Sequence, residues 1–116
     1  MKNQAIELTT FKLNGFTTQQ FIDANTEIDA FLKRQKGFRT RTIFELKKGI
    51  VYDMLLWDSA EEGTAAMHLL MDELSDSVVH DMIDQSTVSW NIAPIEHFVN
   101  LYRNQVIKNE KSTQDI

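Results

Sequence analysis

Five imidazole and carboxylate side chains recur at intervals of four residues, a spacing that could place metal ligands on neighbouring turns of a helix. They are His68, Asp72, Asp76, His80 and Asp84. This stripe drifts around a helix of 3.6 residues per turn, residues 75–77 interrupt it, and the spacing fixes no third ligand. Exposed ion and hydrogen-bond pairs are the preferred interpretation, so the sequence predicts no metal and no cofactor.

A second group of side chains could bind an aromatic compound. Binding such a compound as its anion needs a water-poor pocket, a group that favours the anion and an aromatic wall. The residues predicted to bind a substrate are Asn25, Phe44, Tyr52, Met54 and Trp90, and no catalytic residue is singled out. Tyr52 or Asn25 would polarise a substrate oxygen, and Trp90 would pack on its ring. The alternative is that the aromatic residues and Met54 are ordinary core, which is the commoner outcome at strand spacing.

Charge is distributed unevenly along the chain. Residues 58–84 hold eight acidic side chains and no Lys or Arg, whereas residues 33–48 hold seven basic ones. Arg39 and Arg41 could bind an anionic ligand, but an ion pair of Arg41 with Asp53 across a hairpin is preferred. With 12 Lys plus Arg against 17 Asp plus Glu, the net charge of −5 argues against binding to nucleic acids or anionic membranes.

The elements that must position these residues follow from the hydrophobic period. Residues 4–13 alternate as a strand, with a change of pleat phase expected at a bulge near Thr9 and Thr10. A capping box at Thr17 then begins one helix, which ends at Gly37.

A hairpin is predicted over residues 38–57. A connection through residues 47–49 places Phe44 opposite Tyr52 and Thr42 opposite Met54. This register is preferred because it keeps one side of the ribbon mostly apolar. Phe44, Tyr52 and Met54 are therefore expected to face the helices.

A second helix and a last strand complete the pattern. A capping box at Ser59 begins a helix over about residues 59–74, and a short helical continuation is expected after residue 77. Alternating residues 88–93 predict a strand that ends near Pro94.

This order predicts a ferredoxin-like α+β fold, βαββαβ, with a four-stranded antiparallel sheet and both helices on one face. The open face is expected to carry Ile43, Val51, Leu55 and Trp57. Burying each such side chain is worth about 1.5–3 kcal/mol, so a second sheet should cover them in a twofold homodimer that closes a barrel. Residues 1–100 form this domain, and residues 101–116 are a polar tail.

At two places the chain resembles a known superfamily. The segments ANTEIDAFLKRQKGFRTRT (residues 24–42) and LLWDSAEE (residues 55–62) resemble the dimeric α+β barrel superfamily of antibiotic-biosynthesis-type monooxygenases and their uncharacterised relatives. The most specific elements are a helix that ends in Gln-x-Gly-Phe and the junction Trp57-Asp58-Ser59. The resemblance spans about residues 4–100 and implies a homodimer with a pocket between helices and sheet in each subunit.

The resemblance also includes a haem-degrading branch. That branch has an Asn on the first strand, a Trp in the second helix and a His further along, and the first two positions fall here near Thr10 and Ala66. His68 and His80 lie close by in the sequence without those companions. Haem binding or degradation is accordingly the third hypothesis.

The leading hypothesis is a small-molecule-binding α+β barrel protein that acts as a cofactor-independent monooxygenase on an aromatic or quinol-like compound. The alternative is a non-catalytic ligand-binding or interaction protein of the same fold. The expected partners are a second copy of the chain and a small apolar or aromatic ligand. The absence of Cys excludes disulfides, and no signal peptide or apolar run of 18 residues is present, so a cytoplasmic location is expected.

Overall fold

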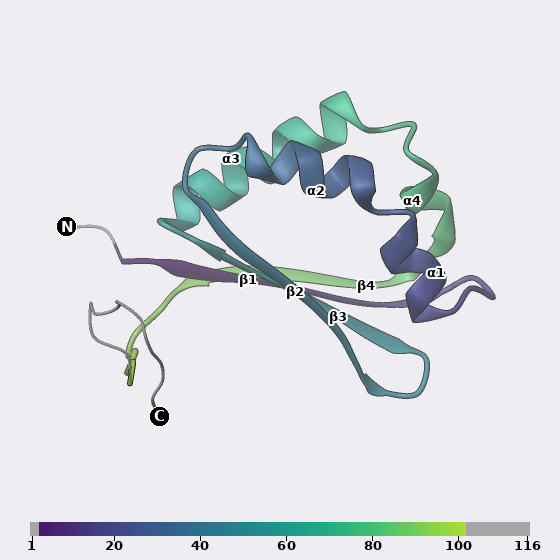
Figure 1. The fold of residues 1–116 in the computed structure, drawn as a ribbon, viewed down its shortest axis with the longest axis horizontal. Coiled ribbons are helices and arrows are strands. Elements are labelled where there is room, and N and C mark those ends of the chain that lie inside the picture. Colours follow the sequence, from purple (N-terminus) through teal and green to yellow (C-terminus); the bar gives the residue numbers. More distant parts are fainter. Residues whose placement is uncertain (1–2, 102–116) are drawn as a thin grey trace, which may run out of the picture.

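Four antiparallel strands form one sheet in the order β2-β3-β1-β4 (Figure 1). The structure is a computed structural model that describes residues 3–101. The strands are β1 (Ala5–Leu13), β2 (Phe38–Lys47), β3 (Ile50–Trp57) and β4 (Ile83–Pro94). The helices α1 (Thr18–Asp23), α2 (Thr26–Lys33), α3 (Ala60–Glu73) and α4 (Val78–Met82) lie on one face of the sheet (Figure 1). The predicted ferredoxin-like α+β fold is confirmed.

The first helical segment is broken at Asn25, where the sequence predicted one continuous helix. Its start is as expected, because the Thr17 side chain accepts from the backbone N–H of Gln20. At the break, Nδ2 of Asn25 donates to the carbonyl oxygen of Phe21 at 2.7 Å. The side chain thus takes the acceptor that the backbone N–H of Asn25 would use in a continuous helix, and this N–H donates to Ile22 instead.

The remaining helices confirm the expected boundaries closely. Ser59 caps α3 by accepting from the backbone N–H of Glu62, and Gly37 has the positive φ, +87°, expected after the first helical segment. Residues 3–101 include no helix that is both long and apolar enough to cross a membrane. The predicted tail lies outside the described residues, apart from residue 101.

The pairing of β1 corrects one prediction. β1 pairs with β3 in unbroken register, so its pleat does not change phase. An irregularity does occur next to the predicted position, but in the pairing with β4, where Thr10 is opposite Ser89 and Lys12 is opposite Asp84. The extra residues belong to β4, which starts at Ile83 and not near residue 88. Apolar residues occur at both odd and even positions of β1 because both faces of this strand are partly apolar, and not because the alternation changes phase.

The hairpin register was predicted correctly away from the turn, but Lys47 pairs with Ile50 in place of the expected Leu46, and the faces were assigned the wrong way round. Phe44 lies opposite Tyr52 and Thr42 opposite Met54, as expected. Side chains alternate between faces, and β3 buries the opposite set beneath the helices. This inward set is Val51, Asp53, Leu55 and Trp57.

The prediction that Phe44, Tyr52 and Met54 face the helices is therefore wrong. The prediction that Val51, Leu55 and Trp57 form the open face is wrong as well. Ile43, which was predicted to join them there, packs against the core. Both parities of β3 are apolar, so alternation alone cannot choose between them. Asp53 and Arg41, which the predicted register placed on the open face, pair with each other inside the protein.

Between sheet and helices the core is largely aromatic. Phe11 of β1 meets Phe21 of α1 edge to face, with ring centroids 5.2 Å apart. Phe38 meets Trp57 in the same way at 5.5 Å. On the far side of the sheet, no helix of residues 3–101 provides cover. Partly exposed apolar side chains on this open face are Ile6, Leu8, Phe44, Tyr52, Met54 and Leu56.

Candidate ligand-binding site

A cavity of about 150 Å³ lies between the sheet and the helices. Its walls are mostly apolar, and the polar groups that reach it include Glu7, Arg41 and Asp53 from the strands and Asn25 from the helical side. Engineered apolar cavities of about this size bind benzene. The cavity therefore has room for one aromatic ring, with polar atoms on both its sheet side and its helix side.

Glu7, on the inward face of β1, is held between two indole rings. Its side chain is buried, with 8% of the residue surface exposed. Oε1 accepts from Nε1 of Trp57 at 2.8 Å, and Oε2 accepts from Nε1 of Trp90 at 2.7 Å. Burial raises the pKa of Glu7 above its ordinary value, although the two indole hydrogen bonds act in the opposite direction. A carboxyl group in this state exchanges a proton closer to neutral pH than a surface glutamate does.

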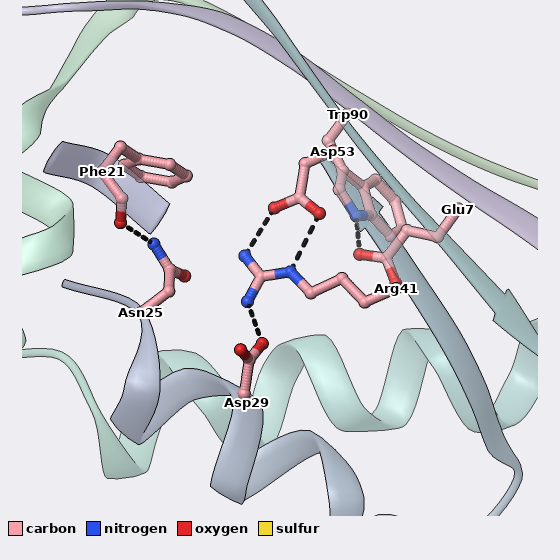
Figure 2. A network of polar contacts seen from close by, with 7 residues as sticks. All are labelled: Glu7, Phe21, Asn25, Asp29, Arg41, Asp53 and Trp90. Carbon is pink, nitrogen blue, oxygen red and sulfur yellow. Dashed lines mark hydrogen bonds and ion pairs between the residues drawn. The ribbon is translucent and has the colours of Figure 1, made fainter. Parts of the chain in front are cut away.

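Arg41 links the sheet to α2 through two carboxylates (Figure 2). Its Nε and Nη2 donate to the two oxygens of Asp53 at 3.0 and 2.7 Å, and Nη1 donates to Asp29 at 2.7 Å. The predicted pair of Arg41 with Asp53 is confirmed. Because two carboxylates neutralise its charge, Arg41 is poorly suited to bind a further anion. Arg39 forms a similar two-point contact with Asp58, but on the surface, and holds the pKa of Asp58 below its ordinary value.

Asn25 lies at the junction of α1 and α2 with 1% of its surface exposed. Its Nδ2 is engaged by the carbonyl oxygen of Phe21, while Oδ1 has no hydrogen-bond partner among the described residues. Asn25 also lines the cavity. Buried polar atoms in native structures normally have a partner, so this oxygen calls for an explanation.

Of the five residues predicted to bind a substrate, the structure brings two to the cavity. Asn25 and Trp90 line it, whereas Phe44, Tyr52 and Met54 lie on the opposite face of the sheet. Phe44 and Tyr52 stack there on each other, with centroids 5.2 Å apart. Sequence reasoning missed Glu7 and placed Trp57 on the wrong face. One signal in the sequence could have found Glu7: in a strand, Glu7 lies on the same face as the apolar residues Ala5 and Phe11.

The stripe of His68, Asp72, Asp76, His80 and Asp84 does not converge on one point. In residues 3–101, no three or more His, Cys, Asp or Glu side chains are grouped so that they could hold a metal ion. His80 lines the cavity, but its Nε2 lies 2.9 Å from the carbonyl oxygen of Leu74. His68 is exposed on α3.

Comparisons with known proteins identify the fold. The structure of a mutant of SnoaB, a cofactor-independent oxygenase from Streptomyces nogalater, matches this chain with a TM-score of 0.66 at 13% identity. The match covers 84% of this chain and 97% of the SnoaB chain. The ActVA-Orf6 monooxygenase of Streptomyces coelicolor, solved with nanaomycin D, matches with a TM-score of 0.66 at 14% identity, over 86% and 94% of the two chains. A NIPSNAP family protein from Agrobacterium tumefaciens matches with a TM-score of 0.63 at 11% identity, over 85% and 91%.

No protein-family model and no curated protein matches the sequence. The chain thus has the fold of the monooxygenase-like proteins of the dimeric α+β barrel class. This confirms the resemblance seen in the sequence at the level of fold. Because one such fold supports many activities, the activity has to be argued from the cavity.

Proposed function

We propose that this protein binds a single-ring hydroquinone-like compound in the cavity and oxygenates it with O₂, without a cofactor. The observation that carries the proposal is Glu7, a buried carboxyl group between Trp57 and Trp90 in a cavity of one-ring size. Similarity in fold to a cofactor-independent oxygenase supports it. Glu7 would receive the proton of a ring hydroxyl, which makes the ring more electron-rich toward O₂.

The proposed reaction balances without an external reductant. One hydroquinone and one O₂ give one hydroxyquinone and one water. After the hydroxyl proton moves to Glu7, a C–O bond forms between O₂ and the adjacent ring carbon. Glu7 returns its proton to the bound peroxide; the hydrogen of that carbon then leaves as a proton, the O–O bond breaks, a carbonyl forms, and the released hydroxide takes up that proton and departs as water. The ring supplies all four electrons that reduce O₂.

The environment of Glu7 suits this role. A phenolic hydroxyl has a pKa of about 10, far above that of an ordinary glutamate, and proton transfer is more efficient when the two values approach each other. Burial raises the pKa of Glu7 toward that of the phenol. The indole N–H groups of Trp57 and Trp90 hold the carboxyl group in one orientation, so it need not reorganise when the proton moves.

Binding and turnover can be tested separately. Trp57 and Trp90 are the two tryptophans of the chain and both line the cavity, so ligand entry is expected to change the intrinsic fluorescence. With hydroquinone, we expect O₂ uptake above the rate without protein, one O₂ consumed per ring. Catalase should return no O₂, because the second oxygen atom leaves as water and not as peroxide. Binding without O₂ uptake would favour the non-catalytic ligand-binding alternative, and no fluorescence change would contradict both.

The haem hypothesis gains no support from this site. A haem macrocycle is several times larger than one aromatic ring, and the cavity measures about 150 Å³. His80, the histidine that lines it, already places Nε2 against the carbonyl oxygen of Leu74.

We further propose that two copies of the chain form a homodimer through the open face of the sheet. The apolar centre of this face comes from β1 and β3, with Leu8 paired opposite Met54 and Ile6 opposite Leu56. Water-exposed apolar side chains in this arrangement are typical of a surface covered by another protein. The proposed dimer thus uses the helix-free face of the sheet, as the sequence predicted, but with the opposite set of side chains on that face.

The Leu8→Lys variant is expected to shift the protein from dimer to monomer at micromolar concentration, because it places a charge at the centre of the proposed interface. Light scattering after size-exclusion chromatography measures the change. The matched control is Leu69→Lys on the outer side of α3, where Leu69 is 41% exposed, and it should leave the mass unchanged. A monomeric wild-type protein at that concentration would refute the proposed interface.

A further inference from the structure

The buried amide of Asn25 has only one possible orientation. The Phe21 carbonyl oxygen can only accept a hydrogen bond, and it lies 2.7 Å from the atom assigned as Nδ2. If the amide were flipped, two oxygens would face each other at that distance. Oδ1 is therefore the atom left without a partner, and it is an acceptor at every pH.

The residue that carries this unpaired oxygen lines the cavity. Asn25 is 1% exposed and is one of its lining residues. In Figure 2, Oδ1 is directed away from Phe21, toward the side on which Arg41 lies. A buried acceptor without a donor costs free energy, and a donor brought by a ligand would remove that cost. The protein thus holds an acceptor at the cavity that its own described residues leave unused.

Asn25 and Glu7 occupy different walls of the same cavity. Asn25 lies at the junction of the two helices, and Glu7 lies on β1 in the sheet; Figure 2 shows them on opposite sides of Arg41. A ring held between these walls would present one substituent to each. At the sheet wall, the proposed function places a hydroxyl group against Glu7.

We propose that Oδ1 of Asn25 is a specificity determinant that accepts a hydrogen bond from an O–H or N–H group at the second end of the ring. This inference rests on the proposed function and assigns the group that recognises the second hydroxyl of a 1,4-dihydroxybenzene. After tautomerisation to the hydroxy-1,4-quinone, the oxidised product carries a carbonyl oxygen at that end. Two acceptors then face each other at Asn25, which favours release of the quinone.

A matched pair of ligands tests this assignment. Hydroquinone and 4-fluorophenol have similar size, but fluorine fills the place of the second hydroxyl without donating. Titrated without O₂ and followed by calorimetry, wild-type protein should bind hydroquinone about tenfold more tightly, the effect of one hydrogen bond to an otherwise unpaired buried acceptor. This exceeds the factor of about two that the symmetry of hydroquinone contributes.

The Asn25→Leu variant should bind the two ligands within that symmetry factor, because leucine fills a similar volume without an acceptor. Should this variant fail to fold, the wild-type ligand pair still decides. Equal binding of both ligands by wild type would overturn the role of Asn25 and leave the proposed function standing. A tenfold preference for hydroquinone over 4-fluorophenol that persists in the Asn25→Leu variant would also overturn the role of Asn25, since another group would then bind the hydroxyl. Failure of both ligands to bind wild type would overturn the inference and the proposed function together.

Discussion

The Arg41→Met variant is expected to lose about 3–5 kcal/mol of unfolding free energy, a large share of the total stability of a domain of this size. Methionine fills much of the space of the arginine stem but leaves the carboxylate of Asp53, 8% exposed, without its cation. An unpaired buried charge is costly because the interior solvates it poorly. Urea denaturation followed by tryptophan fluorescence measures the loss.

A double variant identifies the cause. Arg41→Met combined with Asp53→Leu removes both buried charges, and most of the lost stability should return, since apolar replacement of a complete buried pair is often neutral or stabilising. The remaining carboxylate, Asp29, is half exposed and can be solvated by water. Arg39→Met is the matched control on the same strand, because it breaks a similar contact with an exposed Asp58 and should change stability far less. Equal effects of the two single variants would show that burial does not set the cost.

The second large effect is expected on catalysis. Replacing Glu7 with glutamine should slow hydroquinone oxygenation about 10²- to 10⁴-fold, the usual contribution of a positioned base. The glutamine amide matches glutamate in size and its oxygen can still accept from one indole, but it cannot take a proton. Initial rates of O₂ uptake at saturating hydroquinone measure the effect. Glu61→Gln, on the exposed side of α3, should leave the rate unchanged, and an unaffected Glu7→Gln variant would exclude Glu7 as the base.

The raised pKa of Glu7 gives this prediction a pH signature. The folded protein keeps the proton of Glu7 to a higher pH than the unfolded chain does. The folded state therefore loses stability as the pH rises from the ordinary glutamate pKa through the raised one. The Glu7→Gln variant lacks this group, so its unfolding free energy should not show that decline. Across the same interval, the wild-type oxygenation rate should rise as Glu7 becomes able to accept a proton.

Local sequence signals predicted the elements well. Capping at Thr17 and Ser59, the glycine at residue 37 and the pairing of Phe44 with Tyr52 all follow from interactions within a few residues or across one turn. The break at Asn25 was not predicted, because asparagine is tolerated inside helices. Whether its side chain takes the Phe21 carbonyl depends on how both helices pack on the sheet.

The site was predicted less completely, and the reason is the parity of β3. Its alternating residues are apolar on both faces, so local pattern cannot tell which face the helices cover. The pair of Arg41 with Asp53 was predicted across the hairpin, but the local pattern did not show that this pair lies on the buried face. Glu7 was missed because its two hydrogen-bond donors, Trp57 and Trp90, are far from it in the sequence, and no local pattern predicts that they meet.

The amide of Asn25 couples ligand binding to the stability of the junction between α1 and α2. Its nitrogen donates to the last turn of α1, and its oxygen, on a residue that lines the cavity, has no partner among the described residues. Electron density drawn toward a donor at the oxygen makes the nitrogen a stronger donor in turn. A ligand in the cavity would then strengthen the hydrogen bond between Asn25 and Phe21 and make the junction between α1 and α2 more rigid.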